Sequence, residues 1–258
     1  MMSKETVNYG NWVPKKMIVA LLTFGLICLV IALVPVPVVV RIIFGVLAAL
    51  GLVGFLYFTY AYHVFSSGGG NLQAHLWDIV IEKLPWDGNG KCLDVGTGNG
   101  SLAIFAAKKH PQAEVTGIDY WGKSWNYAQE VCESNAAVEG VGDRLHFQKA
   151  SAASLPFGDG EFDAIISNFV FHEVRDAKDK RDTIREALRV LRKGGAFSLQ
   201  DLLLQKSLYG EMDDLLATIR GWGVEEVHYT DSRSLAEVPL LLRTPMMLGK
   251  MGLIYGKK

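Results

Sequence analysis

Residues 91–100 read K-C-L-D-V-G-T-G-N-G, a short apolar run followed by glycine at every second position. The run 92–95 has the length and composition of a buried strand, and helical spacing of apolar residues follows at 101–109. The three glycines let the backbone turn sharply between these elements and approach a ligand closely. Because open α/β sheets bind ligands at the carboxyl ends of their strands, this loop is the first candidate binding site.

The chain after this loop alternates between short apolar strand patterns and helical patterns. Residues 115–118 and 164–167 are typical of strands, whereas 181–191 and 209–220 have helical spacing. Repeated βα units with short connections predict an α/β fold. In this fold a doubly wound, mostly parallel sheet carries helices on both faces.

The first quarter of the chain is far more apolar than the rest. Residues 17–40 and 42–65 contain no Asp, Glu, Lys or Arg. Each run exceeds the ~20 residues that a helix needs to cross the hydrocarbon core of a bilayer. The stretch V-P-V-P-V between them predicts a tight turn, because proline breaks a helix. We therefore predict a transmembrane hairpin with helices at about 16–34 and 39–63.

This pattern divides the chain into a membrane anchor, 1–65, and a second domain, 66–258. Three lysines precede the first helix and only Arg41 lies near the turn, so the positive-inside bias places both ends of the hairpin in the cytoplasm. We expect the second domain to face the cytoplasm at the cell inner membrane. Gly45 and Ala49 would let the two helices approach closely. A cleaved signal peptide and two buried helices of a soluble protein are the alternatives.

Composition excludes several classes of protein. Half of the residues are hydrophobic (50%), which excludes a disordered chain. The formal net charge of −1 gives no electrostatic case for a nucleic-acid partner. The 3 cysteines are scattered, so neither a disulfide framework nor a metal site is predicted.

Five sequence blocks occur in an order that is typical of one enzyme family. They are L-D-V-G-T-G-N-G, T-G-I-D, L-P-F, F-D-A-I-I-S-N and L-R-V-L-R-K-G-G. With these blocks, residues 72–258 resemble the class I S-adenosyl-L-methionine-dependent methyltransferases, in the methyltransferase type 11-like branch. The resemblance implies a Rossmann-like sheet of seven mostly parallel strands, S-adenosylmethionine as the cofactor, and methyl transfer to a small or lipid-like acceptor.

The resemblance also implies where the cofactor binds. The glycine loop would cradle its methionine part, Asp94 would face its amino group, and Asp119 would hold its ribose. Tyr120 would lie against the adenine, and Ser151 stands where the family often has an acidic residue. The implied cofactor-binding residues are Asp94, Gly96, Thr97, Gly98, Asn99, Gly100, Asp119, Tyr120, Ser151, Ala152 and Asn168.

Asp94 separates this resemblance from a nicotinamide-dependent oxidoreductase, an alternative with the same topology. The nicotinamide fingerprint requires G-x-G-x-x-G, whereas here the third glycine comes one place early. A carboxylate repels a pyrophosphate but attracts the sulfonium and ammonium groups of S-adenosylmethionine. The sign of the charge therefore favours a methyltransferase. A cofactor-binding membrane protein without catalysis is a second alternative, since it would keep the same residues.

Two side chains are candidates for catalysis, because an oxygen or nitrogen nucleophile can require a general base. His172 follows the fourth strand, in a loop that the resemblance places beside the cofactor, although it also suits a structural role at a helix start. Asp201, at the end of the fifth strand, is the second candidate. No metal ligand is expected.

The segment 238–251 is unusually apolar for a connection between two strands, and Arg243 and Lys250 interrupt it. This composition suits a surface at a bilayer interface and also a buried loop that closes the sheet. A membrane tether raises the local concentration of lipid-soluble acceptors, so we favour a lipid, quinone or isoprenoid-type acceptor over a soluble small molecule.

Overall fold

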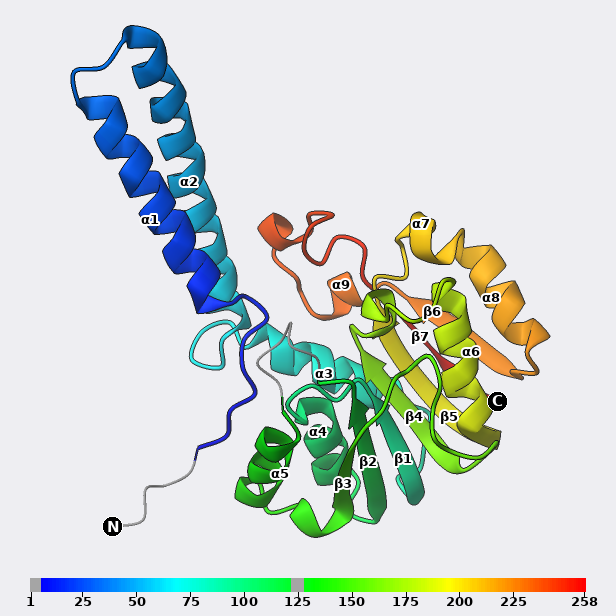
Figure 1. Ribbon diagram of the computed structural model, residues 1–258. Coiled ribbons are helices and arrows are strands. Elements are labelled where there is room, and N and C mark those ends of the chain that lie inside the picture. Colours follow the sequence, from blue (N-terminus) through cyan, green and yellow to red (C-terminus); the bar gives the residue numbers. More distant parts are fainter. Residues whose placement is uncertain (1–5, 122–127) are drawn as a thin grey trace, which may run out of the picture. The chain divides into compact units, whose positions relative to one another are not determined.

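The computed structural model describes residues 6–121 and 128–258, and these residues form two compact units (Figure 1). One unit is Gly10–Ala74, and the other combines residues 6–9 with His75–Lys258. The segment that precedes the apolar hairpin therefore packs with the unit that follows it. The division into an anchor, 1–65, and a second domain, 66–258, stays a prediction.

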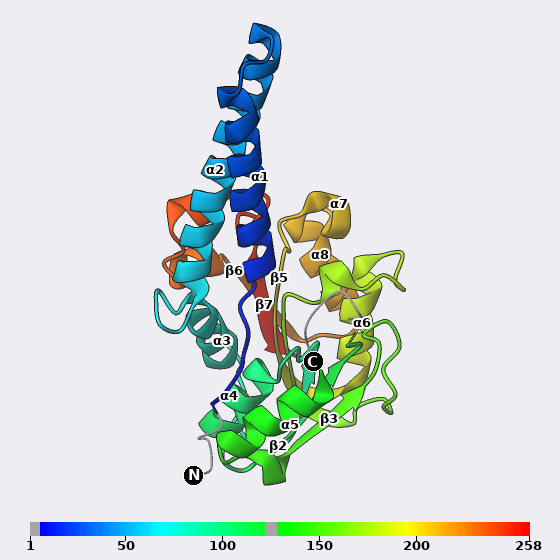
Figure 2. The same ribbon diagram turned by 60° about the vertical axis from the view of Figure 1, so that its left-hand side comes forward.

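The first unit is built from two long helices that lie side by side, α1 (Lys15–Leu33) and α2 (Val38–Phe65) (Figures 1 and 2). They coincide with the two apolar runs, and the chain turns between them at Pro35 and Pro37. Their mean hydropathies are 2.6 and 2.5, so both are long and apolar enough to cross a membrane by length and composition.

The two helices pack closely where Gly25 of α1 meets Gly51 of α2. A Cβ atom on Gly51 would lie 2.9 Å from the Cα of Gly25, a separation that real side chains do not adopt. The expected contact at Gly45 and Ala49 is wrong, because Ala49 is exposed and a Cβ on Gly45 would meet nothing within 4 Å. Helix α2 therefore contacts α1 through the face that carries Gly51, and not through the face that carries Gly45 and Ala49.

The second unit contains a sheet in the order β3-β2-β1-β4-β5-β7-β6, in which only β7 is antiparallel to its neighbours. The predicted doubly wound, seven-stranded and mostly parallel sheet is confirmed. The strands are β1 (Gly90–Val95), β2 (Ala113–Asp119), β3 (Leu145–Lys149), β4 (Phe162–Asn168), β5 (Leu191–Asp201), β6 (Glu226–Thr230) and β7 (Gly252–Lys257).

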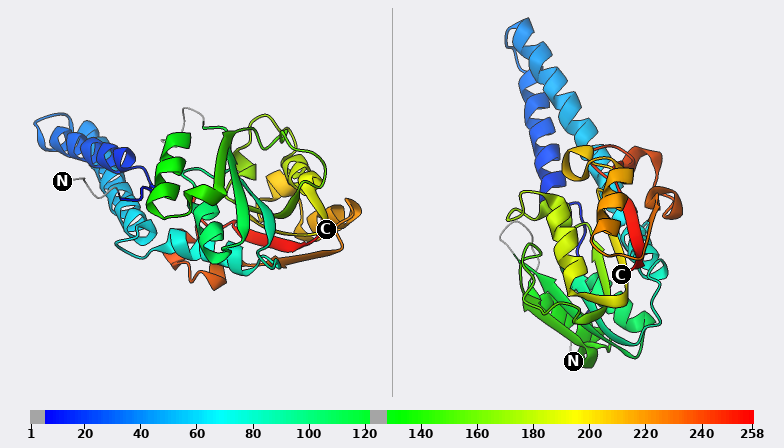
Figure 3. Two further views of the ribbon diagram at one scale, coloured as in Figure 1. Left: turned by 90° about the horizontal axis from the view of Figure 1, so that it is seen from below. Right: turned by 90° about the vertical axis from the view of Figure 1, so that its right-hand side faces the viewer.

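Helices cover both faces of this sheet, with α4 and α5 on one face and α6 and α8 on the other (Figures 1 and 3). The main apolar core lies between strands β4 and β5 and helices α6 and α8. Ile184, Leu188 and Leu215 are buried there. The helices of this part are α3 (Leu72–Glu82), α4 (Ser101–Lys109), α5 (Gln129–Val138), α6 (Lys180–Val190), α7 (Lys206–Tyr209), α8 (Met212–Gly221) and α9 (Ser232–Leu235), with 3₁₀ turns η1 (Gly142–Arg144), η2 (Phe171–Glu173) and η3 (Leu240–Leu242).

The predicted helix over 209–220 is confirmed as α8 (Met212–Gly221), but its predicted start is wrong, because Tyr209 ends the short helix α7 and the chain leaves the helix at Gly210. This glycine has φ 75° and ψ −155°, which takes the backbone out of the helix. A Cβ atom there would also collide with the guanidinium of Arg181, which donates a hydrogen bond to the carbonyl of Tyr209 at 2.9 Å. The hydrophobic spacing runs through the break and therefore does not reveal it.

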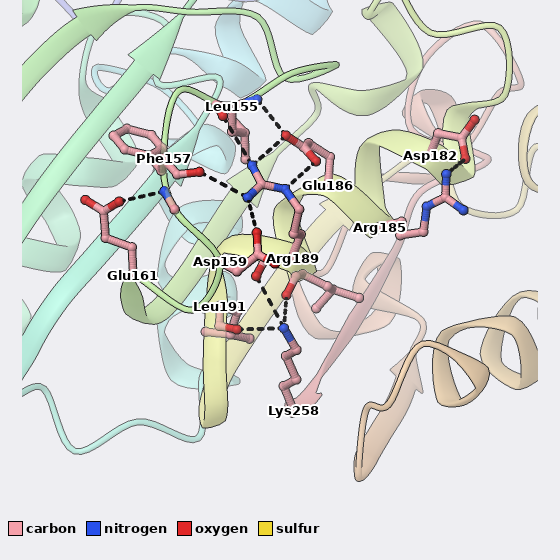
Figure 4. Close-up of polar contacts among 12 residues, drawn as sticks. Leu155, Phe157, Asp159, Glu161, Asp182, Arg185, Glu186, Arg189, Leu191 and Lys258 are labelled. Atoms are coloured by element: carbon pink, nitrogen blue, oxygen red, sulfur yellow. Dashed lines mark hydrogen bonds and ion pairs between the residues drawn. The ribbon is translucent and has the colours of Figure 1, made fainter.

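Arg189 explains why two of the sequence blocks occur together (Figure 4). Its guanidinium donates to the carbonyl of Leu155 at 3.2 Å and to that of Phe157 at 3.0 Å, and it pairs with Asp159 at 2.6 Å. Glu186, one turn earlier on α6, fixes the guanidinium at 2.9 Å. The L-R-V-L-R block thereby holds the L-P-F segment in place ahead of β4.

Candidate cofactor and active site

The loop 96–100 joins β1 to α4 at the carboxyl edge of the sheet. Its three glycines have φ angles of 76°, 57° and 80°, in the left-handed region that favours glycine. The N–H groups of Gly96 and Thr97 both donate to the carbonyl of Ile118 in β2, each at 2.8 Å. A Cβ on Gly96 would collide with the side chain of Val170, so the first glycine is required by packing as well as by conformation.

Asp119, at the end of β2, fixes the glycine loop to the neighbouring strand. Its Oδ2 accepts a hydrogen bond from the N–H of Gly98 at 2.9 Å, and its Oδ1 accepts one from the N–H of Trp121 at 2.8 Å. The indole of Trp121 donates to the carbonyl of Gly98 at 2.9 Å. A carboxylate has about four acceptor positions, so Asp119 can still accept bonds from a ribose.

Asp94 is a buried carboxylate directly beneath this loop. Within residues 6–121 and 128–258, neither of its oxygens makes a hydrogen bond of ordinary geometry, although the Thr97 hydroxyl and the N–H of Ala103 lie near them. Burial raises the pKa of Asp94 to about 7, although the Thr97 hydroxyl and the N–H of Ala103 act in the opposite direction. A buried acid without a partner is costly, and a cationic ligand would relieve that cost.

Tyr120 and Asn168 lie at the same carboxyl edge. The Tyr120 side chain is 62% exposed, and the ammonium of Lys149 lies 5.3 Å from its ring centroid. This exposed ring does not pack in the apolar core. Asn168 ends β4, and its buried Oδ1 has no hydrogen-bond partner in the described part of the chain.

The segment after β3 differs from the expectation at one residue. The Ala152 side chain is buried in the apolar core, so only the backbone groups of this residue could bond to a ligand. Ser151 is half-buried, and its hydroxyl donates to the carboxylate of Asp176 at 3.2 Å. An acidic group thus does stand next to this position, but it comes from the loop after η2.

A segment that lies far away in the sequence also reaches the glycine loop. The carbonyl of Asn8 accepts hydrogen bonds from the side chains of Asn99 at 3.2 Å and Asn135 at 3.0 Å. The N–H of Asn8 donates to Oδ1 of Asn135 at 2.7 Å, and Nδ2 of Asn135 donates to the carbonyl of Asn99 at 2.9 Å. The buried amide of Asn135 therefore joins residues 6–9 to the loop.

Tyr9 secures the same segment beside α4 and α5. Its hydroxyl donates to Glu139 at 2.9 Å, and its ring makes edge contacts with Trp77 and Phe105. Burial and the neighbouring Glu139 carboxylate raise the pKa of Tyr9. Sequence reasoning did not assign Asn8, Tyr9 or Asn135 to the site, and no motif marks them, because a buried asparagine pair has no characteristic spacing.

His172 and Asp201 are brought together at the carboxyl ends of β4 and β5. The His172 Nδ1 lies 2.6 Å from Oδ1 of Asp201, and Asp201 is fully buried. The second oxygen of Asp201 accepts from the N–H groups of Val170 at 3.2 Å and His172 at 3.3 Å. The two residues that the sequence offered as separate candidates therefore form one hydrogen-bonded pair.

The charges around His172 determine the pKa of its imidazole and which ring nitrogen carries the proton. Burial alone would lower the pKa of His172, but the hydrogen bond and the charge of Asp201 outweigh it, and the net effect is a raised pKa. Glu173, whose Oε1 lies 3.7 Å from Nε2, adds to the increase. Because Asp201 accepts from Nδ1, the proton of the neutral ring resides there and Nε2 is the basic nitrogen.

These groups fit S-adenosylmethionine. The left-handed glycines let the loop backbone approach a ligand closely, Asp94 lacks a cationic partner for its charge, and Asp119 retains acceptor capacity. The fold and the site thus define a Rossmann-like α/β domain with a site for a cationic nucleoside cofactor. Within that class, residues 93–199 match the family model described as "Methyltransferase domain". The resemblance seen in the sequence blocks is confirmed.

Known proteins similar to the chain support this assignment. The ubiquinone/menaquinone biosynthesis C-methyltransferase UbiE of Geotalea daltonii is 32% identical over 137 residues, which are 51% of this chain and 55% of the relative. The 27-O-demethylrifamycin SV methyltransferase of Amycolatopsis mediterranei is 36% identical over 135 residues, 52% of this chain and 47% of the relative. The chain therefore spans about half the length of these curated relatives.

A solved structure shares the fold. A geranyl diphosphate methyltransferase in complex with S-adenosylmethionine superimposes with a TM-score of 0.54 at 16% identity, covering 79% of this chain and 89% of that one. At this identity the likeness concerns the architecture of the sheet and its helices.

Proposed function

We propose that the protein is a membrane-anchored, S-adenosylmethionine-dependent methyltransferase that acts on a small, lipophilic acceptor. The observation that carries the proposal is Asp94, a buried carboxylate without a partner beneath a loop of three left-handed glycines. A diphosphate would be repelled at this point, whereas an ammonium or sulfonium would be attracted. This favours a methyltransferase over the nicotinamide alternative.

The chain's own residues would hold the cofactor in a defined orientation. Asp94 faces the methionine ammonium, Asp119 accepts from the ribose, and Tyr120 covers the adenine. When bound, S-adenosylmethionine supplies an electrophilic methyl group. The main task of the residues around it is then to align an acceptor with that group and to exclude water.

His172 is the general base in this proposal. Its Nδ1–H donates to the Asp201 carboxylate, which orients the ring and leaves Nε2 to take a proton from the acceptor. Asp201 stabilises the imidazolium that results. Asp201 is itself a positioning residue, because it is buried and its oxygens already accept from several N–H groups.

The acceptor class follows from the anchor and is supported by the relatives. Two relatives are named for ubiquinone/menaquinone and rifamycin substrates, and a fold neighbour for geranyl diphosphate. Such molecules are small, and quinones partition into membranes. A protein held at the bilayer by α1 and α2 meets acceptors of this kind at high local concentration.

The proposal is tested by following a labelled methyl group. Full-length protein in lipid nanodiscs is incubated with methyl-tritiated S-adenosylmethionine and a lipid extract, and the organic phase is counted. We expect label in the organic phase, a large loss in Asp94→Asn, and normal transfer in Asp143→Asn, an exposed carboxylate outside the site. Tight binding of the cofactor without any transfer would support the non-catalytic alternative instead.

The anchor is tested separately by fractionation. A hairpin that spans the bilayer should stay in the membrane pellet after an alkaline carbonate wash. Release of the full-length chain into the supernatant would contradict the anchor without affecting the methyltransferase assignment.

A further inference from the structure

The connection between β6 and β7, residues 231–251, lies at the same edge of the sheet as the site. Both β5 and β6 pair antiparallel with β7, so β5 and β6 end at the same edge. The N–H of Leu204, just after β5, donates to the carbonyl of Lys250 at 2.9 Å. The connection is therefore attached to the chain that follows Asp201.

This connection is an ordered element rather than an irregular excursion. Backbone hydrogen bonds close several turns within it, including Leu248 N–H to the carbonyl of Leu242 at 3.0 Å and Gly249 N–H to that of Thr244 at 2.9 Å. The guanidinium of Arg233 donates to the carbonyl of Gly249 at 2.8 Å and closes the loop from the other side. The backbone of this segment is thus held by its own hydrogen bonds.

The apolar side chains of the connection point in two directions. Five of them are buried, namely Ala236, Val238, Leu242, Leu248 and Met251. Leu240, Leu241 and Met246 face outward, with 81%, 60% and 80% of their surface exposed. We call these three residues the outer apolar surface. Of the two alternatives that the sequence left open, a buried loop alone does not account for the segment 238–251, because three of its large apolar side chains are exposed.

Residues 237–251 of the same connection contain two cationic residues, Arg243 and Lys250, and one exposed acidic residue, Glu237. Arg243, which lies between Leu241 and Met246 in the chain, is exposed, and its Nε donates to the carbonyl of Val238 at 2.8 Å. Lys250 lies at the end of the connection. Outward apolar side chains together with cations are typical of a surface at the boundary between lipid headgroups and acyl chains.

We propose that the outer apolar surface inserts into the interface of the bilayer that holds the hairpin. This inference rests on the anchoring part of the proposed function. Only residues 66–71 separate the end of α2 from the start of α3, and this length spans at most roughly 20 Å. The second unit therefore remains near the membrane, where a partner of lipid chemistry is always within reach.

The experiment uses single cysteines in full-length protein. The native cysteines Cys28, Cys92 and Cys132 are all buried, so an environment-sensitive fluorophore will label an introduced exposed cysteine selectively. Leu240→Cys and Met246→Cys probe the outer apolar surface. Gln112→Cys, exposed before β2 at the opposite edge of the sheet, is the matched control, and Val46→Cys in α2 reports the hairpin.

The labelled proteins are placed in nanodiscs of phosphatidylcholine and phosphatidylglycerol with or without doxyl-labelled lipid. We expect quenching by the doxyl lipid at positions 240 and 246 to be at least threefold stronger than at 112. Equal, weak quenching at 240, 246 and 112 with strong quenching at 46 overturns this inference and leaves the anchor intact. Weak quenching at 46 as well contradicts the anchor itself. A fluorescence change at 246 that depends on protein concentration, without lipid quenching, shows contact between copies and also overturns the inference.

Discussion

His172 and Asp201 lie at the ends of neighbouring strands and are joined by a hydrogen bond of 2.6 Å between Nδ1 and Oδ1. Asp201 accepts further bonds from the N–H groups of Val170, His172 and Leu202. One buried carboxylate therefore fixes both the loop after β4 and the imidazole that this loop carries. The arrangement makes distinct predictions for the two side chains.

Replacement of His172 should affect the rate and not the binding of cofactor. We expect His172→Ala to lower kcat by about 10²–10⁴-fold, as for the loss of a positioned base, while the Kd for S-adenosylmethionine stays near its wild-type value. Glu173→Gln keeps the imidazole and removes only a neighbouring charge, so as a control it should retain most of kcat and shift only the pH midpoint downward. A loss of less than about threefold in His172→Ala would assign this residue to structure.

The pH dependence of the wild-type enzyme follows from the raised pKa of His172. Only the neutral ring accepts a proton, so kcat should rise with pH and reach half its maximum above pH 6.5, the ordinary value for histidine. In Asp201→Asn the cause of the increase is removed, and the midpoint should move to lower pH as kcat falls. An unchanged midpoint in this variant would show that Asp201 does not act through His172.

Asp94→Asn should make the ligand-free protein more stable at high pH and bind the cofactor more weakly. In the ligand-free protein the Asp94 pKa is about 7, above the ordinary value of 3.8, so the folded state gains stability as pH falls from about 7 toward 4. At pH 8 the buried charge destabilises the protein, and the variant should melt at a higher temperature than wild type. At pH 5, where Asp94 is largely protonated, the two melting temperatures should converge.

The same substitution should weaken the binding of S-adenosylmethionine. A hydrogen bond to a charged group contributes about 1.5–3 kcal/mol, which corresponds to at least a tenfold increase in Kd at pH 8. The wild-type affinity should also decline as pH falls below about 7, since the carboxylate must be charged to attract the ligand. Calorimetric titration at pH 8 and pH 6 measures both effects. A Kd in Asp94→Asn equal to that of wild type would place the ammonium elsewhere.

The parts of the site that the sequence could predict are local. The loop 96–100 and Asp94 belong to one uninterrupted stretch, and Asp119 ends the next strand along the chain. The strand–loop–helix pattern dictates their positions without knowledge of the rest of the sheet. His172 and Asp201 could each be placed at a strand end, but their pairing depends on the register of β4 against β5, in which Asn168 lies opposite Gln200.

The remaining features depend on contacts that no local pattern encodes. The break at Gly210 accompanies a hydrogen bond from Arg181, which comes from α6. The contact between Gly25 and Gly51 depends on how each of the two helices, which are apolar on all sides, is rotated about its own axis. Asn8 and Asn135 are separated by 127 positions. Polar residues of this kind look like ordinary surface residues until the fold buries them together.

Asn135 should support cofactor binding through the glycine loop. Asn135→Ala removes the bonds to both backbone groups of Asn8 and to the carbonyl of Asn99. Each is worth about 0.5–1.5 kcal/mol, and we expect the Kd for S-adenosylmethionine to rise about three- to tenfold. Tyr9→Phe is the matched control, because it loosens the same segment through Glu139 without touching the loop, and its Kd should stay unchanged. Calorimetry on both variants in nanodiscs separates the effects. An equal loss of affinity in both would mean that residues 6–9 act through general stability rather than through Asn99.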